Sequence, residues 1–293
     1  MMSTLTRIRR PGPLVAIAVG YLIAVSGFMI WRGISVSPDY LLVLMVPVAL
    51  LAGRPVRFLA DWAPFIAVFL GWEAMRGFAG KAGFPIHMQD LANLERTFFG
   101  GHIPSAVLQS WFADSRPLVI AATVVYFSHF VVPIGTGLVL WLRDRRQYLR
   151  YVVALMSMAF AAFVFFVLLP TAPPWYANDH GAITGVAKLL RTSLPSSISP
   201  YYQALNPNEV AAFPSLHAAF PFLSFLALRK MFPRGSYAML VWCVAVWFSI
   251  VFLGEHYVVD AAAGVFLATL AWVVTVRVIS PRVALLREPD AAD

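Results

Sequence analysis

His217, His256 and Asp260 are the side chains whose types and spacing best suit transfer of a phosphoryl group without a metal. His256 and Asp260 stand at positions i and i+4. On one helix they would share a face, so the carboxylate could hold one imidazole nitrogen and leave the other free. His217 lies in an earlier polar segment, Pro214-Ser215-Leu216-His217. Two histidines in separate roles, one of them supported by an acid, are what metal-free transfer of a phosphoryl group needs.

Both polar segments stand at the edges of long apolar runs, so membrane helices must position them. The chain of 293 residues is 60% hydrophobic and 12% charged, with a mean hydropathy of +0.75, which excludes a soluble globular domain. Runs of about 18 or more apolar residues are typical of membrane spans. We predict an all-α, polytopic membrane helix bundle of about eight spans, at 13–31, 39–53, 58–76, 117–142, 151–169, 214–229, 237–253 and 257–279.

The net charge of +8 could indicate a nucleic-acid partner, but the distribution of the basic residues argues against one. With a cytoplasmic N-terminus and eight spans, most Lys and Arg fall in short cytoplasmic segments. They are Arg7, Arg9, Arg10, Arg54, Arg57, Arg143, Arg145, Arg146, Arg150, Arg229, Lys230, Arg234, Arg277, Arg282 and Arg287. This pattern sets membrane orientation. We therefore expect both termini in the cytoplasm and no nucleic-acid partner.

The same topology predicts the side of the membrane on which the chemistry occurs. Spans 214–229 and 257–279 would both run inward, which places His217 and His256 at their outer ends. The protein is thus expected in a membrane with its active site extracytoplasmic, and the preference for Arg over Lys points to a bacterial plasma membrane. The single cysteine, Cys243, lies within a predicted span, so we expect no disulfide framework and no thiolate metal cluster. We expect no metal and no organic cofactor.

The segment around Ser215 has the features of a phosphate site. Pro214 suits a first helical turn, and a helix N-terminus attracts phosphate through its free N–H groups and its dipole. The helices that begin at Pro214 and near His256 are expected to converge on one phosphate, with a further hydrogen bond from Ser215. Ser215 could instead be only a helix cap. His256 and Asp260 could instead be a structural pair or a transporter's proton relay.

Two long outside loops flank the predicted site. Residues 77–116 alternate polar and apolar side chains at helical spacing, which predicts short helices on the membrane surface. Residues 170–213 are rich in Pro and Ser and contain Lys188 and Arg191; a loop of this length is expected to act as a lid. His129 lies in the middle of a predicted span and is expected to be too deep to reach the outer site unless a cavity descends to it.

The two polar segments resemble the second and third signature motifs of the type 2 phosphatidic acid phosphatase superfamily. The segment Ala172-Pro173-Pro174-Trp175-Tyr176 and the form His256-Tyr257-Val258-Val259-Asp260 are closest to its inositol phosphorylceramide synthase branch. The resemblance covers about residues 60–275. It implies a six-helix core, with His256 as the nucleophile, Asp260 as its orienting partner, His217 as the acid and then the base, and Ser215 as a phosphate ligand.

The chain departs from this superfamily in its basic residues. The arginine usual six positions before the nucleophile is replaced by Ile250, and no basic residue stands around 169–175, where the Lys-x6-Arg-Pro motif is expected. Gln109 with Arg116-Pro117 repeats that spacing on an earlier segment, which we interpret as coincidence. Lys188, Arg191, Arg76 or Arg116 must then supply the charge. Lys188 and Arg191 are expected to bind phosphate, because their loop leads directly into Pro214, although they could be solvated loop charges. A thinner cationic clamp suits a singly charged diester better than a monoester.

The predicted organisation is an N-terminal segment with two accessory spans at 1–57, a lipid phosphatase/phosphotransferase membrane domain at 58–280, and a cytoplasmic tail at 281–293. The expected reaction transfers a phosphorylated headgroup, such as phosphoinositol, from a phospholipid to a hydroxyl acceptor. The alternative is hydrolysis of a lipid phosphate or a polyprenyl phosphate. A non-enzymatic lipid transporter would carry charged residues deep in several spans and inverted repeats. The expected partners are lipids, and the sequence identifies no protein partner.

Overall fold

The computed structural model describes residues 53–79, 82–193 and 208–287, together with isolated positions between residues 16 and 50. The predicted spans 13–31 and 39–53 lie almost wholly outside the described residues. So do residues 194–207 of the predicted loop 170–213 and residues 288–293 of the predicted tail 281–293.

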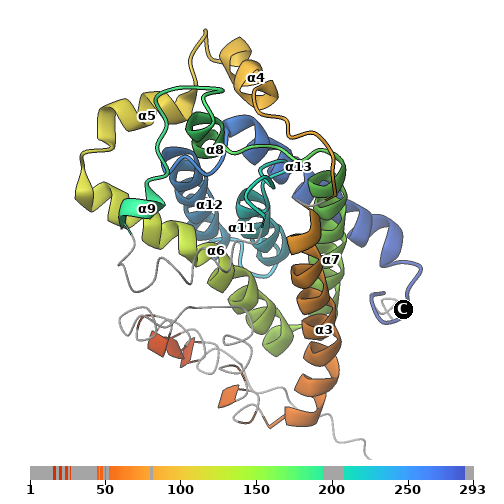
Figure 1. Ribbon diagram of the computed structural model, residues 1–293. Coiled ribbons are helices and arrows are strands. Elements are labelled where there is room, and N and C mark those ends of the chain that lie inside the picture. Colours follow the sequence, from red (N-terminus) through yellow and green to blue (C-terminus); the bar gives the residue numbers. More distant parts are fainter. Residues whose placement is uncertain are drawn as a thin grey trace, which may run out of the picture.

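The described part of the chain is helical (Figure 1). Four helices are long and apolar enough to cross a membrane: α3 (Pro55–Ala79), α7 (Arg145–Leu168), α12 (Gly235–Phe252), and α13 (Val258–Val274) with its π-helical continuation Thr275–Ile279. Helix α6 (Arg116–Arg143) is a fifth if its two bent halves form one span. Helix α11 (Leu216–Leu228) is apolar but has 13 residues. The prediction of a helical membrane protein is confirmed at this level.

The predicted boundaries differ from the observed ones most at the start of α7. The apolar run begins at Tyr151, but the helix begins at Arg145. The cause is the cap: the Asp144 carboxylate accepts hydrogen bonds from the backbone N–H groups of Arg146 and Gln147. A capped first turn can consist of polar residues, so hydropathy alone places the start too late.

Helix α6 bends by 43° between its halves Arg116–His129 and Val131–Arg143. Pro133 explains the bend, because a proline inside a helix donates no hydrogen bond to the carbonyl four residues earlier and its ring crowds that carbonyl. The residue four positions earlier is His129. The bend therefore lies where α6 carries its one histidine.

Helix α11 lies at the centre of the bundle, where it packs against α13, α12, α6 and α7 (Figure 1). Its start is tied to α13 by two features. The Ser215 N–H donates to the Asp260 carbonyl at 3.0 Å, and a Cβ atom on Gly264 would meet the Ser215 carbonyl oxygen at 2.1 Å. Only glycine allows this approach. The two polar segments found in the sequence are thus held together by backbone.

One end of the bundle is covered by residues 82–115 and 169–193, which we call the cover. It contains the short helices α4 (Asp90–Phe98), α5 (Pro104–Phe112), α8 (Pro174–Asp179) and α9 (Leu190–Ser193), and lies at the top and left of the view in Figure 1. Its apolar core surrounds Tyr257, the residue after His256, with Ala92, Ile103 and Ala172. The cover is therefore packed directly onto the segment that carries the nucleophile candidate.

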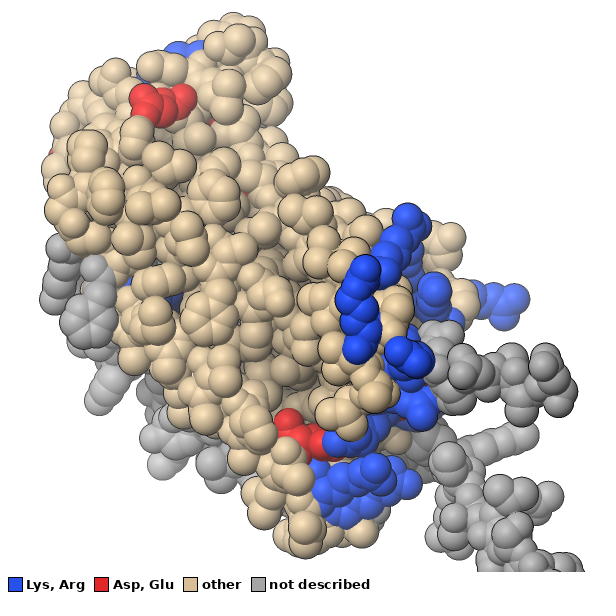
Figure 2. Space-filling view, turned by 90° about the vertical axis from the view of Figure 1, so that its right-hand side faces the viewer, with Lys and Arg blue, Asp and Glu red and all other residues tan. Residues whose placement is uncertain are grey.

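Charged side chains are unevenly distributed over the surface. Figure 2 shows one face that is largely uncharged, with Lys and Arg gathered toward one end of it. Large apolar side chains are exposed on the helices, among them Leu59, Val124, Val241 and Phe266. An uncharged apolar face of this kind suits contact with lipid.

Candidate active site

The structure brings His217, His256 and Asp260 into one hydrogen-bonded row. His217 Nδ1 lies 2.9 Å from His256 Nε2, and His256 Nδ1 lies 3.2 Å from Asp260 Oδ2. Asp260 is fully buried and His256 is nearly so, whereas His217 is half-buried. An ionised carboxylate only accepts hydrogen bonds, so His256 donates through Nδ1 and its Nε2 carries the lone pair. That nitrogen, facing a second imidazole, could act as a nucleophile with an acid at hand.

The geometry of the His256–Asp260 pair differs from the predicted one. His256 lies before the helix, because α13 begins at Val258 and Tyr257 is its cap. The Asp260 carboxylate turns back to accept both from His256 and from the Tyr257 N–H at 3.2 Å. The i, i+4 contact is real, but it arises from a capping box rather than from one helical face.

The turn before His256 depends on Gly254. Its φ is +80°, and a Cβ there would lie 2.7 Å from the Ala187 carbonyl oxygen. The N–H groups of Glu255 and His256 then both donate to the Ile250 carbonyl, at 3.0 and 3.1 Å. A left-handed glycine thus ends α12 and turns His256 toward His217.

Ser215 lies at the N-terminus of α11 and is fully buried. Its Oγ accepts a hydrogen bond from the Ala218 N–H at 3.3 Å, so it is the cap of α11. A hydroxyl that accepts at a cap can still donate its own proton to an oxygen. The capping role and the predicted phosphate contact are therefore compatible.

The prediction that the N-terminus of α13 also binds phosphate is wrong. Glu95 Oε1, from α4 in the cover, accepts from the Val258 N–H and, at 3.4 Å, from the Val259 N–H. The carboxylate thus occupies the place where an anion would bind a helix N-terminus. Glu95 is fully buried, and burial, with the nearby Asp260 charge as a lesser cause, raises its pKa to about 7.

Sequence reasoning missed Glu95 because it looked like one more polar residue of a surface helix. Its only signal was its position three residues after Ala92, which places both on one face of α4. That face is the buried one.

A third histidine, His129, also belongs to the site. Its ring centroid lies 4.1 Å from that of His217, and the Tyr126 ring stacks on His217 at 4.9 Å. His129 Nδ1 lies 2.5 Å from the Tyr126 carbonyl, so this nitrogen carries the proton. The expectation that His129 is too deep is wrong, because α11 carries His217 down to meet α6 at its bend. Arg76, on α3, is close enough for its charge to act on both His129 and His217.

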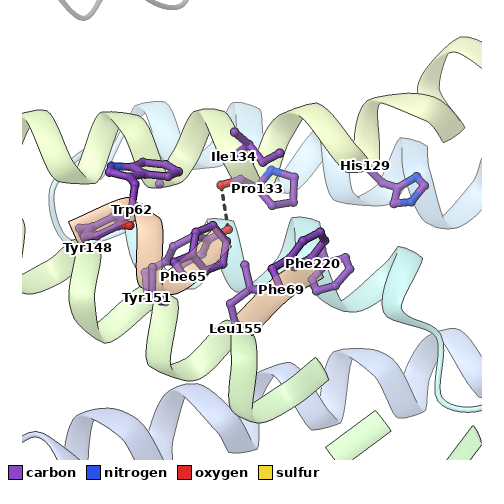
Figure 3. Close-up of a pocket in the computed structure, with 12 residues that line it drawn as sticks. Trp62, Phe65, Phe69, His129, Pro133, Ile134, Tyr148, Tyr151, Leu155 and Phe220 are labelled. Carbon is purple, nitrogen blue, oxygen red and sulfur yellow. Dashed lines mark hydrogen bonds between the residues drawn. The ribbon is translucent and has the colours of Figure 1, made fainter. Parts of the chain in front are cut away.

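An apolar pocket starts beside this histidine and continues into the bundle. Figure 3 shows His129 at one end and Trp62 and Tyr148 at the other, with Phe69 and Phe220 between them. The pocket lies between α3, α6, α7 and α11. The surface exposed in this pocket is apolar, as contact with a hydrocarbon chain requires.

Lys188 and Arg191 lie together against Trp175 in the cover. Lys188 Nζ is 3.8 Å and Arg191 Cζ is 4.9 Å from the centroid of its indole ring. Arg191 also pairs with Asp179 at 2.7 Å. Lys188 is buried rather than solvated, and this burial lowers its pKa, although the Glu255 charge opposes the shift. The structure therefore places Lys188 near Glu255, the residue that precedes His256.

Backbone and amide hydrogen bonds attach this part of the cover to the His256 segment. The Trp175 N–H donates to the Gly254 carbonyl at 3.1 Å. Gln109 Nε2 donates to the carbonyls of Ala187 and Phe252, both at 2.9 Å, and its Oε1 accepts from the Ala187 N–H. Gln109, set aside as a coincidental match in the sequence, thus bridges the cover and the site.

Ile250, at the position of the missing arginine, is fully buried in an apolar cluster with Val246, Phe252 and Leu253. The structure leaves no room for a cation in that cluster without loss of packing. Among the described residues, no three His, Cys, Asp or Glu side chains are grouped as a metal site requires.

Comparison with known proteins identifies related sequences. The sequence pattern of the PAP2 superfamily matches residues 89–274. The phosphoinositol dihydroceramide synthase of Bacteroides thetaiotaomicron is 28% identical over 80% of this chain and 83% of its own length. The inositol phosphorylceramide synthase catalytic subunit of Schizosaccharomyces pombe is 29% identical over 64% of this chain and 47% of its own length. The Candida albicans inositol phosphorylceramide synthase is 27% identical over 53% of this chain and 31% of its own length. No solved structure matches.

Proposed function

Because this chain belongs to the PAP2 superfamily of membrane enzymes, we propose that it is a lipid phosphotransferase that works through a phosphohistidine on His256. The observation that carries the proposal is the 2.9 Å contact between His256 Nε2 and His217 Nδ1, with Asp260 behind His256. A lone pair, a proton donor and an orienting acid in one row are the groups that the reaction needs.

In the first half-reaction, His256 Nε2 attacks phosphorus as the bond to the lipid oxygen breaks. His217 enters this step as an imidazolium and gives its proton to the leaving oxygen, which departs as an alcohol. In the second half-reaction, neutral His217 takes the proton of an acceptor hydroxyl, whose oxygen attacks phosphorus and breaks the P–N bond. Asp260 keeps the proton on His256 Nδ1 throughout, so that Nε2 is free to form and release the bond to phosphorus.

The phosphate oxygens are bound in this proposal by Ser215, Lys188 and Arg191. Ser215 donates its hydroxyl proton at the start of α11, and the two cations approach from the cover. Glu95 caps α13, so that helix end adds little positive potential, and the clamp is weaker than two open helix ends would make it. A weak clamp suits the single negative charge of a phosphodiester.

The donor is proposed to be a phospholipid with a phosphoinositol headgroup, and the acceptor a lipid or glycan hydroxyl. The names of the relatives support this choice, since all three describe synthases of phosphoinositol-bearing ceramides. The apolar pocket that ends at His129 supports a substrate with a hydrocarbon chain near His217.

The alternative is hydrolysis of a lipid phosphate or polyprenyl phosphate, which shares the first half-reaction. In that case His217 would activate water in the second. The half-buried position of His217 is compatible with access of water as well as of a hydroxyl.

We also propose eight spans, cytoplasmic termini, and an extracytoplasmic site in a bacterial plasma membrane, with the membrane domain at 58–280 between the segments 1–57 and 281–293. Single cysteines in a Cys243→Ser background test this topology in intact cells. Cysteines at Ser110 and Thr184 should react with a membrane-impermeant reagent, and those at Gln147 and Arg234 should be protected. The reverse pattern would place the site in the cytoplasm.

The proposed reaction is tested with phosphatidylinositol labelled in its headgroup, incubated with the full chain and either ceramide or diacylglycerol. Label in a new lipid product would support transfer, whereas release of soluble inositol phosphate alone would support hydrolysis. Efficient hydrolysis of phosphatidic acid without activity on any diester would make the protein a phosphatase.

A further inference from the structure

Glu255, the residue before His256, is buried without full use of its hydrogen-bonding capacity. Glu255 is only 6% exposed. Its carboxylate oxygen Oε1 has no hydrogen-bond partner among the described residues. An acceptor left unpaired in the protein interior costs stability. A group retained in this state next to a reacting side chain suggests a partner that arrives with the substrate.

The surroundings of Glu255 are polar on the side of the cover. Its carboxylate interacts electrostatically with Lys188 and His256, and the Trp175 indole N–H lies close to it. Lys188 in turn lies over the Trp175 ring. Burial raises the pKa of Glu255, and the Lys188 charge is the first of the effects that oppose this shift. The carboxylate, the ammonium and the indole form a buried polar cluster between the cover and His256.

The unpaired carboxylate oxygen of Glu255 determines which kind of ligand this polar cluster can bind. A carboxylate oxygen accepts hydrogen bonds and cannot donate them, so its partner must be a donor. A phosphate oxygen is excluded, because two like charges at short range repel. The portion of a phosphodiester that lies beyond the phosphorus, on the side away from the leaving lipid, is the headgroup. Headgroups offer hydroxyls and ammonium groups as donors, and the Lys188 charge next to Glu255 disfavours a second ammonium. The donor that Glu255 lacks is therefore a headgroup hydroxyl.

We propose that Glu255, with Lys188 and Trp175, binds the polyhydroxylated headgroup of the donor lipid and selects for it. The proposal rests on the proposed function and assigns substrate selection to a residue outside the row of reacting groups. Selection has an attractive and a repulsive part. The carboxylate hydrogen-bonds a hydroxyl of a polyol headgroup, and it also repels the second negative charge of a phosphate monoester.

The test compares donor lipids with the full chain in detergent micelles of fixed charge, which keeps the surface potential constant. Glu255→Gln removes the charge but keeps the shape of the side chain. For phosphatidylinositol, kcat/KM should fall by about 10–100-fold, as for the loss of a charge-assisted hydrogen bond. For phosphatidylethanol, a diester whose headgroup has neither a hydroxyl nor an ammonium group, it should stay within about threefold, and for phosphatidic acid it should rise.

Asp179→Asn is the matched control, because it removes one carboxylate charge from the same cover, on the exposed ion pair with Arg191. It should leave the ratio of phosphatidylinositol to phosphatidylethanol turnover unchanged. An equal loss on both diesters in Glu255→Gln would mean that the residue only supports the fold around His256, and would overturn the proposal. So would the same change of ratio in the control.

A hydroxyl of the acceptor could in principle be the ligand instead. The two sources are separated by following release of inositol phosphate to water without an acceptor lipid. If Glu255 binds the headgroup, Glu255→Gln should lower the rate of inositol phosphate release as well as the rate of transfer. A loss in transfer alone would mean that Glu255 binds the acceptor, and would overturn the proposal.

Binding without turnover separates this proposal from the proposed reaction. Glycerophosphoinositol should raise the Tm of the wild-type protein more than glycerophosphoethanol does, and Glu255→Gln should abolish the difference. Equal Tm shifts with the two compounds in the wild type would overturn the headgroup site. Failure to form a phosphohistidine, with the Tm difference intact, would instead reject the reaction and leave the site standing.

Discussion

The segments 213–217 and 254–260 and the cover contribute to the same site in different ways. The two segments supply the reacting atoms. Within each segment the contacts join residues close in sequence: His256 pairs with Asp260 four residues later, and Ser215 caps its own helix. The cover supplies long-range contacts. Glu95 reaches Val258 across 163 residues of sequence, and Gln109 reaches Phe252 across 143. The comparison teaches that chemistry is encoded locally here, whereas alignment and selection come from distant segments.

If this division is correct, changes in the two segments should remove activity and changes in the cover should adjust it. The predictions below are ordered by the size of the expected effect.

Asp260→Asn should lower kcat by on the order of 10²–10⁴-fold while the protein still folds, because the amide no longer fixes the proton on His256 Nδ1. Steady-state turnover of labelled phosphatidylinositol measures the effect, with size-exclusion elution in detergent as the check on folding. A loss of less than about threefold would mean that Asp260 takes no part in the reaction. It would also contradict the assignment of the reacting groups to the two segments.

Gly264→Ala should strongly destabilise the joint between α11 and α13, since the new Cβ would meet the Ser215 carbonyl at 2.1 Å. Backbone must move, at a cost of about 1–3 kcal/mol or more. The Tm in detergent should fall and turnover with it. Gly135→Ala, on α6, is the control, because a Cβ there has nothing within 4 Å. Equal behaviour of the two variants would show that the close approach does not hold the segments together.

Glu95→Ala should lower kcat by about tenfold, an effect that comes from the cover. The change leaves the Val258 and Val259 N–H groups without their acceptor, at a cost of about 1–3 kcal/mol, and loosens the start of α13. Glu95→Gln keeps an acceptor and should lose only a few-fold. Asp90→Asn on the same helix is exposed and should have no effect. If Glu95→Ala equalled Asp260→Asn in its effect on kcat, the distinction between the two regions would disappear.

The smallest expected effect is a dependence of stability on pH through Glu95. Its pKa is raised from 4.5 to about 7 by burial, so the folded protein holds this proton over a range in which the unfolded chain has lost it. Stability from this group is full below about pH 4.5 and declines as the pH rises toward 7. The Tm of the wild type should therefore fall relative to that of Glu95→Gln between pH 5 and 8. A constant difference in Tm would show that Glu95 does not titrate in this window.

The sequence predicted the parts of this structure that depend on local pattern. The six predicted spans from 58–76 to 257–279 were visible as apolar runs, and they correspond to α3, α6, α7, α11, α12 and α13. The pairing of His256 with Asp260 followed from their spacing. The backbone arrangement that brings these two side chains together could not be predicted. A capping box at the start of α13 and a shared helical face give the same i, i+4 contact.

The remaining errors have one physical origin, which is that hydropathy and spacing say nothing about contacts between distant segments. Glu95 looked like a surface residue until α4 was seen to place it on α13. His129 looked too deep because the bend at Pro133 and the central position of α11 could not be foreseen. Gln109 was dismissed for its place in the sequence, although its amide lies beside the turn at Gly254.

The central claim is that His256 becomes covalently phosphorylated, and it can be tested by trapping the intermediate. The full chain is mixed briefly with headgroup-labelled phosphatidylinositol, quenched in base and digested for peptide analysis. The account predicts an acid-labile, base-stable label on the peptide that contains His256, and none in His256→Ala. Normal turnover by His256→Ala, or label retained in that variant, would contradict it.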